Sequence, residues 1–112
     1  MTLRVRILPR AKTDFLSIFS YIEERSRDGA SRWRLAFESG VERARNNPQQ
    51  FPLAPEDTMT SFTLRQLLFK TQQGLTYRAV FTVLDDELLI QCVPSFRSIE
   101  RERHNVAALR FF

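Results

Sequence analysis

The sequence has few of the residues from which most enzyme sites are built. Its 112 residues include one histidine, His104, and one cysteine, Cys92. A zinc site needs three or four clustered ligands, and a nucleophile dyad or triad would need that same histidine, so we expect neither. The three glycines lie outside any glycine-rich run, which argues against a phosphate-cradling loop. We therefore expect no metal and no cofactor, and we interpret Cys92 as a buried small hydrophobic residue.

Long apolar runs are also missing. The longest, such as Leu67–Phe69 and Ala79–Leu84, are far shorter than the roughly 20 residues that span a bilayer. The first six residues, Met-Thr-Leu-Arg-Val-Arg, carry charges where a signal peptide needs an apolar core. We expect a soluble, cytoplasmic protein without a membrane partner, and its length predicts a single domain over residues 1–112.

Lysine is scarce, whereas arginine is abundant. Of the 17 basic residues only Lys12 and Lys70 are lysines, and the net charge is +4. Arginine presents a planar fork of donors that suits phosphates and carboxylates. A basic, arginine-rich domain is typical of proteins that bind RNA, DNA or an acidic protein, although solvated surface arginines are the simpler interpretation of any single one.

Two stretches have the period of amphipathic helices. Apolar residues recur every three or four positions from about 10 to 26, and again from Ala30 to Ala44. Asp28 is a suitable cap for the second helix, and Asn46-Asn47-Pro48 ends it. The turn between the helices is short, so they are expected to form an antiparallel hairpin.

Four stretches have the character of strands. Residues 3–7 alternate between apolar and basic, and three further runs cover 62–69, 76–84 and 88–93 with short polar connections, as in an antiparallel meander. The proline-rich segment 46–61 is expected to be an ordered loop, pinned to the core by Phe51 and Leu53. The order strand, two helices, three strands predicts a two-layer α+β domain with a helical hairpin packed on a small antiparallel sheet.

Arginines on and after the last three strands are the candidate site residues. Alternation predicts that Arg65 and Arg78 lie together on the sheet face that the helices leave open, with Arg97 following the last strand. Such a cluster can grip a phosphodiester and stabilise the charge that develops during cleavage, or bind a partner's carboxylates. Isolated surface arginines paired with nearby acids remain the alternative. His104, in a charged tail, is a possible general acid or base but is more simply a solvated side chain.

A set of short motifs spreads over nearly the whole chain and resembles one family in order and spacing. It comprises Leu8-Pro9-Arg10-Ala11-Lys12-Thr13-Asp14-Phe15, Ile18, Tyr21-Ile22-Glu23, Ala30, Pro48, Phe51-Pro52, Arg65, Tyr77-Arg78-Ala79-Val80-Phe81 and Phe96-Arg97. In this the chain resembles the ParE/RelE toxin superfamily. The resemblance implies the same fold, together with a cognate antitoxin that neutralises the toxin, and a homodimer or a heterotetramer with the antitoxin is possible.

Two activities occur in that superfamily. RelE-like members are ribosome-dependent mRNA endonucleases (mRNA interferases), and on this pattern Arg65, Arg78, Arg97 and His104 are the catalytic candidates. ParE-like members poison DNA gyrase and are not nucleases. The lysines of the RelE pattern have no clear match here, and the first half of the chain resembles the ParE-type, plasmid-stabilisation branch.

The sequence therefore favours a gyrase-directed toxin over an mRNA interferase. A third interpretation remains, in which the chain is an inactive family member that only binds a partner. Whether the chain is an enzyme depends on which of these holds.

Overall fold

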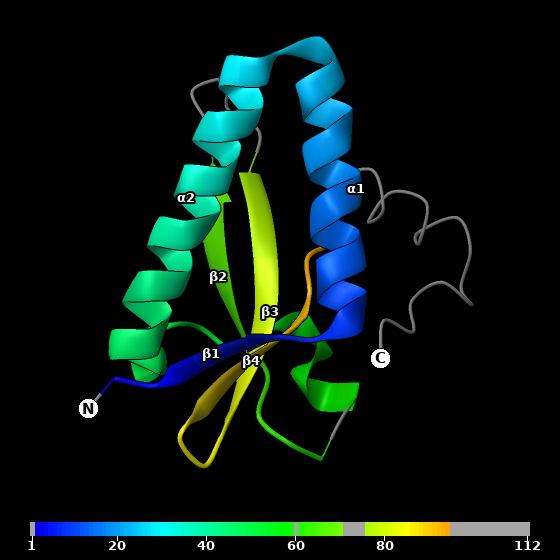
Figure 1. Ribbon diagram of the computed structural model, residues 1–112. Helices are drawn as coiled ribbons and strands as arrows, with labels where there is room; N and C mark the ends of the chain where they lie inside the picture. Colours follow the sequence, from blue (N-terminus) through cyan, green and yellow to red (C-terminus); the bar gives the residue numbers. More distant parts are fainter. Residues whose placement is uncertain (1, 60, 71–75, 95–112) are drawn as a thin grey trace.

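The computed structural model describes residues 2–59, 61–70 and 76–94 (Figure 1). The elements follow one another as a strand, two long helices, two short 3-10 helices and three strands. Their bounds are β1 (Arg4–Ile7), α1 (Pro9–Arg25), α2 (Arg27–Asn46), η1 (Pro48–Gln50), η2 (Pro55–Met59), β2 (Arg65–Lys70), β3 (Thr76–Leu84) and β4 (Glu87–Cys92).

The helical hairpin forms as the sequence predicts. α1 begins at Pro9, whose fixed φ and missing N–H suit the first helical position. A single residue, Ser26, separates the two helices, and its Oγ accepts a hydrogen bond from the Gly29 N–H at 2.9 Å. Ser26 is therefore the N-cap of α2, and the prediction of Asp28 in that role is wrong. Asp28 lies instead in the first turn of α2, where its negative charge suits the helix dipole.

The sheet confirms the α+β class and adds a parallel pair. The strand order is β1-β4-β3-β2, and β2, β3 and β4 form the expected antiparallel meander. β1 lies at the edge and pairs in parallel with β4, from Arg4 beside Glu87 to Ile7 beside Ile90, so the sheet is mixed. At the turn between β3 and β4, Asp85 adopts a positive φ of 55°, a conformation that aspartate tolerates better than most residues.

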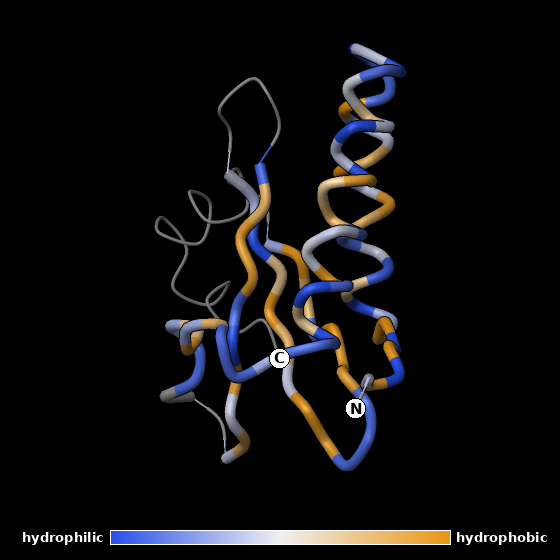
Figure 2. The backbone as a smooth tube through the Cα atoms, turned by 90° about the vertical axis from the view of Figure 1, so that its left-hand side faces the viewer, coloured by the Kyte–Doolittle hydropathy of each residue, from blue (hydrophilic) through white to orange (hydrophobic). Residues whose placement is uncertain are grey.

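Both helices lie on one side of the sheet, so the domain has two layers (Figures 1 and 2). The core between the layers centres on Trp33 of α2, which is fully buried. Its ring lies 4.9 Å from that of Phe15, 5.6 Å from that of Phe69 and 5.7 Å from that of Tyr77, measured between centroids. Aromatic side chains from α1, α2, β2 and β3 thus hold the helices on the sheet.

A bulge in β4 reverses the direction of its last side chains. Val80 pairs with Cys92 and the next residue, Phe81, pairs with Ile90, so one step along β3 matches two along β4. Ile90 therefore packs in the core beneath the helices, whereas Cys92 packs on the opposite face with Val80. That opposite face carries a second, smaller cluster of buried residues: Ala54, Leu64, Val80 and Cys92.

The proline-rich loop covers part of that second face, where its Ala54 belongs to the smaller cluster. Phe51 packs on the core, with its ring 5.9 Å from that of Phe81, as predicted. Leu53 is 53% exposed, so its side chain does not pin the loop; its backbone forms an isolated antiparallel bridge to Arg65 instead. β2 starts at Arg65 and not at residue 62, because Leu64 exchanges its backbone hydrogen bonds with the loop rather than with β3.

Candidate functional site

The structure separates the arginines that the sequence suggested would share one face. Arg65 stands opposite Phe81 in the β2–β3 ladder, whereas Leu68 stands opposite Arg78. Directly opposed residues point to the same side of a sheet, so Arg65 lies on the helix side and Arg78 on the other. The predicted pairing of Arg65 with Arg78 on one open face is therefore wrong. Arg97 and His104 lie outside the described residues.

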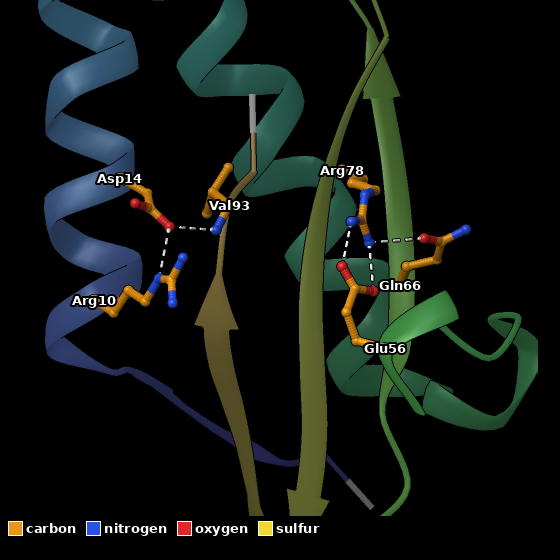
Figure 3. Close-up of polar contacts among 6 residues, drawn as sticks. All are labelled: Arg10, Asp14, Glu56, Gln66, Arg78 and Val93. Carbon is orange, nitrogen blue, oxygen red and sulfur yellow. Dashed lines mark hydrogen bonds and ion pairs between the residues drawn. The ribbon is translucent and has the colours of Figure 1, made fainter. Parts of the chain in front are cut away.

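Arg78 is held in a buried ion pair with Glu56 (Figure 3). Its Nη1 donates to Glu56 Oε1 at 2.9 Å, its Nη2 donates to Glu56 Oε2, and Nη1 also donates to Gln66 Oε1 at 3.3 Å. The two charged side chains are 14% and 5% exposed. The fork of donors is thus satisfied within the protein, as is typical of a bidentate arginine–carboxylate pair.

Local hydrogen bonds position Glu56 over Arg78. Ala54 N–H donates to Leu64 O, and Leu64 N–H donates to Asp57 Oδ1, both at 2.8 Å. These bonds fix η2 across the sheet face opposite the helices, so that face is covered at Arg78. This contact cannot be predicted from a sequence pattern, because Glu56 lies 22 positions before Arg78 in a loop and no periodicity links the two.

Arg65 also has a structural partner. Its Nη1 donates to the backbone carbonyl of Phe51 at 2.7 Å, and the side chain is half-buried. It lines a small hollow of about 240 Å³ together with Thr63, Thr82 and the η1 segment. The hydrogen bond ties the proline-rich loop to β2, so Arg65 acts as a clamp on that loop.

A second carboxylate, partly buried, joins α1 to the end of β4. Asp14 Oδ2 accepts a hydrogen bond from the Val93 N–H at 3.0 Å, and Arg10 Nε lies 4.0 Å from the same oxygen (Figure 3). Burial raises the pKa of Asp14 above its ordinary value, against the opposing effects of the Val93 N–H and the Arg10 charge. Asp14 thus forms a fixed contact between α1 and the residue that follows β4.

The thiol of Cys92 is buried in the sheet. Cys92 is fully buried as predicted, and desolvation raises its pKa to about 12. Thiolate is the nucleophilic form of cysteine, so Cys92 is not suited to catalysis near neutral pH. Within residues 2–59, 61–70 and 76–94, no three His, Cys, Asp or Glu side chains are grouped to hold a metal ion.

An apolar groove lies between the helical hairpin and the edge strand β1. Val5, Phe15, Phe37 and Val41 supply apolar lining, and the volume is about 390 Å³. Ile7, 42% exposed, also lines the groove. The charged residues along it come from α2 and have both signs: Arg34, Glu38, Glu42 and Arg45. This apolar lining suits a partner with an apolar face.

The part of the chain that the structure describes contains no helix with the length and apolarity needed to cross a membrane. The chain matches the family model described as the ParE toxin of the type II toxin–antitoxin system parDE, over residues 5–98. No curated protein matches the chain. The matched range includes the helical hairpin, the Glu56–Arg78 pair and the sheet apart from Arg4 at the start of β1. The chain belongs to the ParE toxin family, the toxins of type II toxin–antitoxin systems.

Proposed function

We propose that this toxin inhibits DNA gyrase by binding it and that it does not cleave RNA. The observation that carries the proposal is the buried pair between Arg78 and Glu56. A nuclease of the RelE kind would need Arg78 free to stabilise charge on a scissile phosphate. Here Nη1 and Nη2 of Arg78 already donate to Glu56 and Gln66, and Arg65 points to the other side of the sheet.

The experiment separates a structural arginine from a catalytic one. Replacing Arg78 alone leaves Glu56 as an unpaired buried charge, and the resulting loss of stability would abolish either activity. The double variant Arg78→Met, Glu56→Met removes both charges and conserves the volume approximately. It is expected to fold and to remain toxic, with gyrase supercoiling inhibited as strongly as by the wild type.

The opposite result would support the nuclease alternative. If the folded double variant is harmless, and if the wild type cleaves transcripts in a translating extract while leaving gyrase unaffected, the proposal is wrong. A wild-type protein that is harmless in a sensitive host and affects neither gyrase nor transcripts would also contradict it, in favour of an inactive binding module.

We further propose that a cognate antitoxin occupies the apolar groove beside β1. Its mixture of an apolar lining and charges of both signs suits an amphipathic helix laid along the groove. Ile7→Asp places a charge at the groove and is expected to weaken antitoxin binding strongly. Leu84→Asp is the matched control, because Leu84 is similarly exposed and lies outside the groove.

The antitoxin test uses the product of the neighbouring gene, co-purified with each variant. Retention of the Leu84→Asp variant together with loss of the Ile7→Asp variant supports the groove as the binding site. Equal retention of both variants would place the antitoxin elsewhere on the toxin.

A further inference from the structure

A hollow of about 460 Å³ lies on the side of α2 away from the apolar groove, where this helix meets the edge strand β2. α2 approaches β2 closely: a Cβ added to Gly40 would come within 2.8 Å of Leu67 Cδ1. On the solvent side of this contact the hollow is lined by Ala36, Ser39 and Arg43 of α2 and by Leu68, Phe69, Lys70 and Thr76 of the strands.

The polar lining of this hollow is cationic or hydroxylic. Arg43 and Lys70 are exposed, and neither forms an ion pair with any other described residue. The Arg43 guanidinium lies 5.9 Å from the centre of the Phe51 ring, a contact that leaves its donors available. Ser39 and Thr76 add two exposed hydroxyl groups.

Helical spacing adds a third cation to this side of α2. Intervals of four, three and four residues separate Arg32, Ala36, Ser39 and Arg43 in turn. At these helical spacings all four side chains lie along one side of α2. Arg32 is exposed and also has no ion pair among the described residues. At a rise of 1.5 Å per residue, Arg32 and Arg43 stand about 16 Å apart. The carboxylate of Asp28 lies one turn beyond Arg32, at the far end of this side.

Charge is distributed unequally around α2. The side that faces β1 carries Glu38 and Glu42 as well as arginines, and Glu42 lies 3.4 Å from Arg45. The side that faces β2 carries Arg32 and Arg43 around small residues. Lys70 and its register partner Thr76 belong to the sheet face away from the helices, so at this sheet edge they line the rim of the hollow. We give the name basic hollow to the lining residues Ser39, Arg43, Lys70 and Thr76 together with Arg32, which lies beyond the hollow on the same side of α2.

We propose that the basic hollow binds the sugar–phosphate backbone of a nucleic acid. Arginine, lysine, serine and threonine are the side chains that make most contacts to phosphate oxygens, and such contacts are independent of base sequence. The chemistry of the hollow offers little to a peptide, because its largest apolar residue, Phe69, is buried and Leu68 is its only exposed apolar side chain. An acidic peptide is the alternative that the experiment must exclude.

The test compares two triple variants with the same net charge. Arg32→Gln, Arg43→Gln, Lys70→Gln removes the cations of the basic hollow. The control, Arg6→Gln, Arg27→Gln, Arg34→Gln, removes three exposed arginines that lie elsewhere and likewise form no ion pair within the described ranges. Fluorescence anisotropy measures the binding of a labelled 20-base-pair DNA and of a labelled single-stranded RNA between 50 and 200 mM salt, conditions chosen for the steep salt dependence of phosphate contacts.

The expected result is a selective loss in the hollow variant. Three lost phosphate contacts reduce the slope of log affinity against log salt by about 3 and reduce the affinity by about 100-fold at 0.1 M salt, whereas the control variant stays close to the wild type. The stronger of the DNA and RNA responses identifies the kind of nucleic acid. Thermal unfolding of both variants checks that they remain folded.

Three results would overturn the proposal. The first is an equal loss of affinity in the two variants, which would reflect net charge alone. The second is that the wild type binds neither nucleic acid. The third is that the wild type binds a labelled oligoglutamate more tightly than it binds either nucleic acid. None of them bears on gyrase inhibition, which is measured separately, so failure of this inference is distinguishable from failure of the proposed function.

Discussion

Replacing one member of the Glu56–Arg78 pair is expected to destabilise the protein far more than replacing both. The side chains are 5% and 14% exposed, so Glu56→Met leaves the Arg78 guanidinium in a site with little water, and Arg78→Met does the same to the Glu56 carboxylate. Breaking a buried pair in this way costs about 3–5 kcal/mol. For a domain of this size, that loss lowers Tm by roughly 12 °C or more.

The double variant Glu56→Met, Arg78→Met is expected to recover most of this loss. Both charges are then absent, and two flexible apolar side chains fill a similar volume beside Leu64, Val80 and Cys92. We expect its free energy of unfolding to lie within about 1–2 kcal/mol of the wild type. The four proteins together form a double-mutant cycle that isolates the coupling between the two residues.

Trp33 fluorescence provides the assay. Trp33 is the only tryptophan and is fully buried, so its emission reports unfolding by urea or heat. The matched control is the exposed pair of Arg4 and Asp86, whose side chains are 71% and 64% exposed at a separation of 3.1 Å; single replacements there should barely change Tm. If the losses in the Glu56 and Arg78 single variants simply add in the double variant, the two residues are not coupled and the argument from their pairing is wrong.

Three further predictions concern single residues. Asp14→Asn keeps an oxygen that can accept a hydrogen bond from the Val93 N–H. Because burial raises the pKa of Asp14, the folded wild type loses stability as pH rises through that pKa, and the variant should gain stability relative to it. Urea titrations at several pH values measure this difference in the free energy of unfolding. Cys92, with a pKa of about 12 and no exposed surface, should resist iodoacetamide at pH 8 until the protein is denatured, as mass spectrometry would show; rapid alkylation of the native protein would contradict its burial. Ser26→Ala removes the cap of α2 and should cost about 1 kcal/mol in chemical denaturation, whereas Ser26→Asp should restore it.

Much of the fold could be predicted because the two helices each have one apolar stripe with a regular period. Trp33 and Phe37 repeat at helical spacing and are both buried against the sheet. The pairing of β1 with β4 is different, because it joins residues about 80 positions apart and leaves no local pattern in the sequence. The class of the fold therefore followed from the sequence, whereas the parallel edge strand did not.

The face of β2 was assigned incorrectly because this strand is covered on both sides. Leu67 and Phe69 pack under the helices, while Leu64, just before the strand, packs on the opposite face with Val80. Apolar residues therefore occur at both odd and even positions, and alternation cannot indicate which set faces the helices. Assigning the even-numbered residues of β2 to the helix side predicts Arg65 on the open face, whereas the structure places Arg65 on the helix side.

The candidate site depended on tertiary contacts that the sequence does not encode locally. Arg78 was identified as a notable residue, but its role is determined by Glu56, which a proline-rich loop brings across the sheet. The same loop is held by the hydrogen bond from Arg65 to the Phe51 carbonyl. Both arginines thus help to fix the loop, which is a structural role that composition alone could not distinguish from catalysis.

Gyrase inhibition is tested most directly by a supercoiling assay with the purified full chain, gyrase, ATP and a relaxed plasmid. The wild type and the Glu56→Met, Arg78→Met variant are both expected to inhibit supercoiling. Gyrase inhibition by this toxin would be contradicted if supercoiling proceeds unchanged while the wild type, but not the folded double variant, cleaves messenger RNA on translating ribosomes.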